Sequence, residues 1–214
     1  MSDSNLRLAA AALATEFRIA ALHVRGAWRV RRLANRHPLK LHLGCGEKPK
    51  PGWINLDLGA SADIKLDLRR PLPFDEHSCE AIYSEHFLEH VEYPHATQRL
   101  LSECRRVLRP GGVFSVGVPD TEWPMSEYLG VTSDGYFSIA KERWHPDWCR
   151  TRMEHLNFHF RQAGEHKFAY DLETLLATLR TAGFVEVRAR EFCATLDSAD
   201  RRIGTIYVDC TKPS

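Results

Sequence analysis

From residue 38 onward the chain alternates short apolar runs with longer segments of helical spacing, and this alternation limits the possible folds more than any other feature. Most of the short runs are bounded by Gly, Pro, Asp or Ser, which indicates strands between turns. Helices are predicted at about residues 94–108 and 171–182, because their apolar side chains recur at helical spacing. Strands that alternate with helices predict an α/β fold with a mostly parallel sheet, whose ligands bind at the carboxyl ends of the strands. The predicted strands are residues 40–43, 53–56, 63–66, 80–84, 113–118, 184–190 and 203–210.

The cysteines bear on the cellular compartment. All six stand singly, without a C-x-x-C pair, in a chain of 214 residues. A disulfide framework is not expected in a chain of this length without a secretory signal, and arginines interrupt the apolar stretch at the N-terminus. We therefore expect a protein of the reducing cytoplasm.

The stretch "LHLGCGEKPKPGWINLD", residues 41–57, carries the first functional signal. A strand runs into Gly44 and Gly46, as in loops that hold nucleotides. A dinucleotide-binding fold requires a third small residue, in the pattern G-x-G-x-x-G/A, where a helix begins, so that the pyrophosphate lies on the helix N-terminus. Here Pro49 takes that position and further helix breakers follow. The loop therefore argues against a nicotinamide enzyme.

The segments "LHLGCG", "WINLD", "DIKLDLRRPLPFDEHSCEAIYSEHFLEH" and "RRVLRPGGVFSVGVPD" follow one another in this order. Together they resemble class I S-adenosylmethionine-dependent methyltransferases, above all a small bacterial group whose loop reads G-W-I-N-x-D. The resemblance covers about residues 39–120, and "DLETLLATLRTAGF" at 171–184 extends it. It implies a Rossmann-like, doubly wound sheet of seven strands, with the last strand antiparallel, and S-adenosylmethionine as cofactor.

The resemblance also implies roles for residues at the strand ends. Gly44 and Gly46 would let the backbone approach the cofactor, Asp57 would bind the ribose hydroxyls, and Asp67 would receive the adenine amino group. The other interpretation of both aspartates is turn formation at a strand end. His42 departs from the family pattern, in which an acidic residue often helps to orient the cofactor. The predicted cofactor-binding residues are His42, Leu43, Gly44, Cys45, Gly46, Asp57, Leu58, Asp67, Leu68, Ser84 and Glu85.

His86, Glu89 and His90 follow the fourth predicted strand and would share one face of a helix, which makes them the candidate catalytic residues. His86 suits a general base or a contact to the methyl acceptor, because histidine titrates near neutrality. Structural hydrogen bonding is a second interpretation. The third is a metal site, resembling the E-x-x-E-H motif of some methyltransferases. His86 in place of the first glutamate disfavours magnesium, whereas zinc would accept this set, completed by His155 or His159.

Between about residues 119 and 167 the alternation lapses, and this insertion is rich in aromatic residues and histidines. An insertion of that length suggests a lid over the site, and an inert helical cap is the alternative. His155 and His159 are spaced as neighbours on a helix, which is compatible with binding or with packing. Cys45 in the glycine loop is interpreted as a packing residue, because no base stands beside it in sequence.

Residues 5–36 are predicted to form one long helix with a stripe of six arginines: Arg7, Arg18, Arg25, Arg29, Arg32 and Arg36. One flank of the stripe carries Leu6, Leu13, Phe17, Val24 and Trp28, and the other carries Leu8, Ile19, Leu22, Val30 and Leu33. Such a basic amphipathic helix suits an anionic membrane surface. Packing on the body or on the second subunit of a homodimer is equally open, and nucleic acid is disfavoured because the rest of the chain is mildly acidic.

These observations lead to one functional prediction. The chain consists of a basic amphipathic helix, residues 1–37, and a methyltransferase domain, residues 38–214, with the lid at about 119–167. We expect methyl transfer from S-adenosylmethionine to an oxygen of a glycan, a glycolipid or a small hydroxylated metabolite. The alternative is a binding or regulatory protein on the same fold without activity. We expect a cytoplasmic location, with peripheral attachment to the inner membrane left open.

Overall fold

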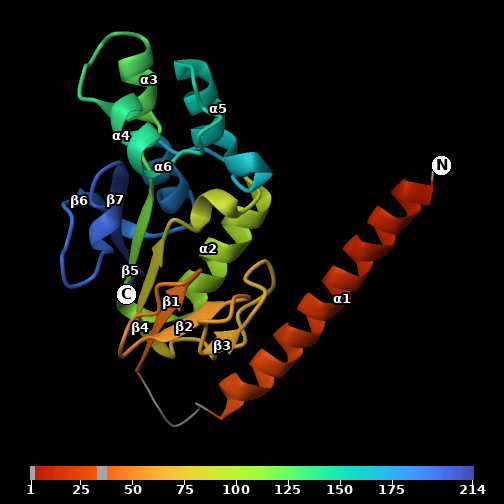
Figure 1. Cartoon of the computed structure of the whole chain (residues 1–214). Helices are drawn as coiled ribbons and strands as arrows, with labels where there is room; N and C mark the ends of the chain where they lie inside the picture. Colours follow the sequence, from red (N-terminus) through yellow and green to blue (C-terminus); the bar gives the residue numbers. More distant parts are fainter. Residues whose placement is uncertain (1–2, 33–37) are drawn as a thin grey trace.

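The computed structural model describes residues 3–32 and 38–214, which form one mixed sheet with helices packed on it (Figure 1). The seven strands follow the order β3-β2-β1-β4-β5-β7-β6, and β7 runs antiparallel to both of its neighbours. The predicted α/β class, the seven strands and the antiparallel last strand are thus confirmed. The strands are β1 (Leu39–Leu43), β2 (Ile54–Asp57), β3 (Ile64–Lys65), β4 (Cys79–Glu85), β5 (Leu108–Pro119), β6 (Val185–Arg190) and β7 (Thr205–Thr211).

The three central strands, β1, β4 and β5, are parallel and are buried toward their carboxyl ends. Helices α2 (His95–Val107) and α6 (Leu172–Thr181) pack on the sheet and on each other. Asp171 caps α6 by accepting a hydrogen bond from the backbone N–H of Thr174. Because β1 is parallel to both β2 and β4, the carboxyl ends of these three strands lie at the same end of the sheet, together with the glycine loop and Asp57.

The insertion after β5 folds into three helices, α3 (Glu122–Tyr128), α4 (Tyr136–Arg143) and α5 (Arg152–Arg161), followed by the short helix η2 (Gln162–Gly164). Asp120 and Tyr170 form an isolated bridge at its base, so the insertion leaves and re-enters the domain at one place. Thr151 and Glu154 form a capping box that starts α5. The three helices stand together at one end of the molecule (Figure 1), and we call residues 121–169 the lid.

Helix α1 (Asp3–Arg31) is long and reaches the body at its C-terminal half (Figure 1). It passes so close to β3 that a Cβ on Gly26 would lie 2.2 Å from the carbonyl oxygen of Lys65. Val30 is buried in the core, and Glu16 pairs with Arg69. Glycine at position 26 therefore allows one flank of the helix to pack on the edge of the sheet. Leu33 and Arg36 of the predicted helix lie outside the described residues.

The opposite flank of α1 is not covered by the described residues. Its large apolar side chains are between 53% and 69% exposed: Leu6, Leu13, Phe17, Val24 and Trp28. The arginines of the stripe from Arg7 to Arg32 are exposed as well. Among the described residues, no helix is apolar over a sufficient length to span a membrane.

Candidate active site

The two glycines of the loop after β1 have different surroundings. Gly44 has φ +65°, and a Cβ there would lie 2.2 Å from the ring of Phe87. Gly46 has φ +52°, and a Cβ there would meet nothing within 4 Å. Both positions favour glycine for their backbone angles, but Gly44 in addition makes room for Phe87. Only the backbone at Gly46 faces open space where a ligand can approach.

Asp57 ends β2 and lies beside this loop. Its Oδ2 accepts a hydrogen bond from the backbone N–H of Gly46 at 2.9 Å, and its Oδ1 accepts one from Gly59 at 2.8 Å. Each oxygen retains one further lone pair for a ligand, because an ionised carboxylate offers about four acceptor positions. The carboxylate is therefore oriented by the backbone and still able to bind two hydroxyl groups.

Asp57 lines a cavity of about 190 Å³, which we call the Asp57 cavity. Its apolar walls suit an adenine ring, and its one oriented carboxylate suits a ribose. The residues at this place thus fit the adenosine part of S-adenosylmethionine. The cavity is lined by Asp57, Leu58, Leu66, Asp67, Leu68, Arg69, Phe87, His90 and Val91.

Asp67 lies at the same cavity, but its carboxylate is largely occupied. Arg69 donates from Nε to Oδ1 at 2.8 Å, from Nη2 to Oδ2 at 3.0 Å and from its backbone N–H to Oδ1 at 3.0 Å. Burial alone would raise the pKa of Asp67, but the hydrogen bonds from Arg69 outweigh it and hold this pKa below its ordinary value. Arg69 also pairs with Glu16 of α1, so the network extends from the cavity to the N-terminal helix.

His42 is buried on β1 and does not line the Asp57 cavity. Its Nδ1 lies 2.9 Å from Oδ1 of Asn55, and since an amide oxygen only accepts, Nδ1 carries the proton. Burial lowers the pKa of His42 to about 4, so the ring is neutral at pH 7. Asn55 in turn accepts from the backbone N–H of Lys50 and donates to Asp63, which holds the proline-rich loop against β2. His42 thus takes part in positioning this loop.

The other predicted cofactor-binding residues differ in whether they have a polar group available to a ligand. Leu43 is a core residue, and burial raises the pKa of the Cys45 thiol to about 11, which keeps it protonated. Glu85 is buried and accepts hydrogen bonds from Ser198 and Tyr207. Ser84 is buried at the end of β4, in register with Leu43, and its hydroxyl has no hydrogen-bond partner among the described residues. Among these residues, Ser84 therefore has the hydroxyl that is available to a ligand, and it lies beside the start of the glycine loop.

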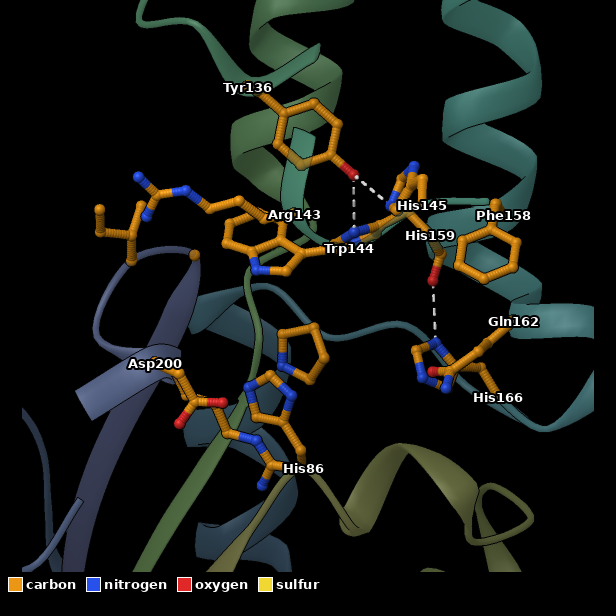
Figure 2. Close-up of a pocket in the computed structure, with 14 residues that line it drawn as sticks. His86, Tyr136, Arg143, Trp144, His145, Phe158, His159, Gln162, His166 and Asp200 are labelled. Carbon is orange, nitrogen blue, oxygen red and sulfur yellow. Dashed lines mark hydrogen bonds between the residues drawn. The ribbon is translucent and has the colours of Figure 1, made fainter. Parts of the chain in front are cut away.

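The lid and the strand ends enclose a second cavity, of about 370 Å³, which we call the lid cavity. Figure 2 shows His86 from the β4 end and Tyr136, Trp144 and Phe158 from the lid around the same space. Arg143 and Arg201 add positive charge, and Asp200 is paired with Lys48. The lid histidines are neutral, because burial lowers the pKa of His145 to about 4 and that of His159 to about 3. The cavity therefore offers mainly flat aromatic surfaces, with cationic donors among them.

His86 does not share a helical face with Glu89 and His90, contrary to the spacing argument. Its φ is +53°, and only Leu88–His90 form a short 3₁₀ helix, η1. Its backbone N–H bonds to the carbonyl of Gly117, and its Nε2 lies 2.8 Å from Oγ1 of Thr205 on β7. Burial, assisted by the charge of Arg201, holds the pKa of His86 well below its ordinary value, so the imidazole is neutral.

The three candidate catalytic residues consequently face different places. His86 lines the lid cavity and His90 lines the Asp57 cavity. Glu89 is 2% exposed and lines a void of about 10 Å³ between the strand ends and the lid, together with His159 and His166. His166, Arg201 and Thr205 were not predicted as site residues, because they come from distant segments and have no motif spacing to η1.

The strand order, the glycine loop and the oriented Asp57 define a class I S-adenosylmethionine-dependent methyltransferase fold. Residues 41–116 match the family described as "Methyltransferase domain". This stretch therefore belongs to a methyltransferase domain, and S-adenosylmethionine is its cofactor. The match includes the glycine loop, Asp57, Asp67 and the candidate catalytic residues, but not the lid.

Several solved structures are similar to this chain. A SAM-dependent methyltransferase from Archaeoglobus fulgidus is similar over 87% of this chain and 92% of its own, with a TM-score of 0.50 and 17% identity. An S-adenosylmethionine-dependent methyltransferase from Mesorhizobium loti is 20% identical over 82% of this chain and 91% of its own, with a TM-score of 0.48. The CurJ carbon methyltransferase is 17% identical over 83% of this chain, with a TM-score of 0.48, and this chain spans about half of it, 49%. No curated protein matches the sequence.

Proposed function

We propose that this protein transfers a methyl group from S-adenosylmethionine to a hydroxyl group of an acceptor held in the lid cavity. The observation that supports this is the placement of two consecutive residues. His86 lines the lid cavity and Phe87 lines the Asp57 cavity, so the chain at 86–87 lies between the two. Donor and acceptor sites on either side of one short segment are what an in-line displacement requires.

The residues of the chain have distinct tasks in this reaction. The cofactor, when bound, supplies an electrophilic methyl group. Asp57 would hold it by accepting from the ribose hydroxyls, and Leu58 and Leu68 would pack on the adenine. The lid side chains would exclude water from the acceptor hydroxyl.

His86 is proposed as the proton acceptor. The proposed role requires the tautomer in which Nε2 donates to Thr205 Oγ1, because the lone pair is then on Nδ1, and this atom would receive the proton. The lowered pKa makes His86 a weak base, but the acceptor oxygen becomes strongly acidic as the new C–O bond forms. Proton transfer at this late stage is downhill even to a weak base.

The walls of the lid cavity favour a small hydroxylated acceptor or the terminal sugar of a glycan or glycolipid. Aromatic faces such as Tyr136 and Trp144 pack on the apolar faces of sugar rings, and Arg143 and Arg201 can donate to hydroxyl oxygens. A volume of about 370 Å³ is at the low end for ligand sites, which favours one or a few rings over a long chain.

The test is methyl transfer from labelled S-adenosylmethionine to a panel of sugars, sugar glycosides and small alcohols, with the demethylated cofactor product measured in parallel. The His86→Ala variant should lower kcat by roughly 10²- to 10⁴-fold and leave cofactor affinity nearly unchanged. Thr205→Val is the matched control, which removes the hydrogen-bond partner but keeps the imidazole, and should have a smaller effect. Full turnover by His86→Ala would contradict the assigned role.

Binding without catalysis is the second candidate function. Two observations favour it. His42 is neutral at a position where the methyltransferases that the chain resembles often have an acidic residue, and the carboxylate of Asp67 is already bonded to Arg69. A protein of this kind would bind the cofactor in the Asp57 cavity but release no demethylated product with any acceptor of the panel.

We further propose that the exposed face of α1 attaches the protein to an anionic membrane surface. Leu6, Phe17 and Trp28 on this face are more than 60% exposed, and the arginines lie beside them. Each arginine near an anionic surface contributes about 1 kcal/mol, and insertion of the apolar side chains adds to that. The packed flank of the helix would meanwhile keep the domain at a fixed orientation to the surface.

Point variants separate attachment from packing better than truncation, since Val30 belongs to the core. Arg18→Glu with Arg25→Glu, and separately Phe17→Ser with Trp28→Ser, should abolish sedimentation with phosphatidylglycerol vesicles at low salt. Neither pair should change the melting temperature appreciably, because these side chains are exposed. Wild-type protein that ignores the vesicles and runs as a dimer in light scattering would instead assign this face to a second subunit.

A further inference from the structure

Glu89 is the most unusual buried group of the described chain. It is 2% exposed, and neither carboxylate oxygen has a hydrogen-bond partner. Leaving a buried carboxylate without partners is costly, so buried acids are normally paired, bonded or bound to a cation. Its backbone carbonyl is by contrast well used, accepting from the N–H groups of Lys167 and Phe168 at the end of the lid.

Two imidazoles converge on this carboxylate. Nε2 of His90 lies 3.9 Å from Oε1 of Glu89, and the rings of His90 and His166 are 5.0 Å apart. One ligand atom from each of Glu89, His90 and His166 lies within 4.8 Å of the others. Around a tetrahedral ion with ligand distances near 2 Å, neighbouring ligand atoms are about 3.3 Å apart, so the three atoms would need to approach one another by up to about 1.5 Å.

The ring of His166 is oriented by a hydrogen bond of the kind found at metal-binding histidines. Its Nδ1 lies 2.8 Å from the backbone carbonyl oxygen of His159, which only accepts, so Nδ1 carries the proton. The lone pair of the neutral ring is then on Nε2. Metal-bound histidines usually have their other nitrogen bonded to a carbonyl or carboxylate in this way.

We propose that Glu89, His90 and His166 bind a divalent transition-metal ion, with zinc as the best match. Two nitrogen ligands and one carboxylate oxygen suit zinc, whereas magnesium prefers oxygen ligands alone. The void of about 10 Å³ beside Glu89 is about the size of one water molecule. His159, which lines the same void and has an unpartnered Nε2, is the candidate for the remaining position.

Such an ion would tie the segment after β4 to the segment at the base of the lid. His90 also lines the Asp57 cavity, and His166 also lines the lid cavity, so the ion would lie between the two. It would thereby fix the separation of the cofactor side from the acceptor side. His86 is not among the ligands, in contrast to the set considered from sequence.

A second cluster in the lid, His145, Cys149 and His155, is the rival site. Its groups satisfy one another, because the two Nδ1 atoms are 2.8 Å apart and the Cys149 thiol donates to the carbonyl of Glu154. This cluster therefore has no buried carboxylate without hydrogen-bond partners, as Glu89 has. This cluster provides the matched control for the experiment.

The experiment uses the full-length protein, stripped with a chelator and dialysed, and titrated with Zn²⁺ and with Co²⁺ as spectroscopic probe. We expect one equivalent of metal per chain, visible Co²⁺ bands and a raised melting temperature with Zn²⁺, and no response to Mg²⁺. Glu89→Gln keeps the shape of the side chain and should weaken Zn²⁺ binding by at least 100-fold, since loss of a group that only orients a ligand already costs 10- to 100-fold. His166→Asn should do the same.

Cys149→Ser should leave affinity, stoichiometry and Co²⁺ bands unchanged. Three outcomes would overturn the proposal: no Zn²⁺ bound by wild type, unchanged binding in a folded Glu89→Gln, or loss of binding in Cys149→Ser alone. The readout is metal binding, so it stands or falls independently of methyl transfer.

Discussion

Replacing Asp57 by alanine tests the cofactor site at the residue that the structure orients best. Both oxygens already accept one backbone N–H, from Gly46 and Gly59, so at most two positions remain for ribose hydroxyls. Hydrogen bonds to charged groups contribute about 1.5–3 kcal/mol, and the ribose bonds of one carboxylate are not additive. Asp57→Ala should therefore cost about 1.5–3 kcal/mol, or roughly 10- to 150-fold in Kd.

The assay is isothermal titration of S-adenosylhomocysteine into wild type and variant. Asp57→Asn is the matched variant, since its amide retains one acceptor oxygen, and its loss should be smaller. Melting in the absence of ligand checks that the glycine loop survives the loss of its two carboxylate contacts. A folded Asp57→Ala with unchanged Kd would reduce Asp57 to a turn residue and refute the reasoning.

Two further predictions concern stability. His42 is neutral when folded, with its pKa lowered to about 4, and has an ordinary pKa near 6.5 when unfolded, so the unfolded chain binds more protons between these values. The contribution of His42 to the free energy of unfolding should thus be fully present above pH 6.5 and fall by roughly 3 kcal/mol toward pH 4. Denaturant titrations should show a shallower fall of the unfolding free energy with pH for His42→Gln, and equal slopes for wild type and variant would contradict the assignment. Gly44→Ala should destabilise more than Gly46→Ala, because a Cβ at position 44 would lie 2.2 Å from the Phe87 ring, while both positions share the cost of about 1–2 kcal/mol for positive φ. Phe87→Ala should partly rescue Gly44→Ala in thermal melts, and the absence of rescue would show that the contact does not matter.

The sheet could be predicted from the sequence because its signals are local. Each strand end carries its own turn residues, and Asp57 follows its strand directly, so the alternation alone places it at the ligand edge. The same logic failed after β4. Helical spacing suggested one face for His86, Glu89 and His90, but His86 adopts φ +53° and only a short 3₁₀ helix follows. Tertiary contacts to Gly117 and Thr205 decide its orientation there.

The partners of several site residues could not be predicted, because they depend on how distant segments pack. Nothing in the spacing of the lid indicates that His166 approaches Glu89, or that Arg201 lies near His86. Partners two residues away, such as Arg69 for Asp67 and Gly59 for Asp57, are the kind that local spacing can indicate. For α1, the sequence pattern indicated two apolar flanks, and the contact of Gly26 with β3 and the burial of Val30 show which flank is packed.

Calorimetry of the wild-type protein with S-adenosylmethionine, S-adenosylhomocysteine and NADH tests directly whether the Asp57 cavity binds the cofactor. We expect one equivalent of either sulfur compound bound per chain, each raising the melting temperature, and no binding of NADH. No heat and no shift in melting with S-adenosylmethionine or S-adenosylhomocysteine at millimolar concentration would contradict it.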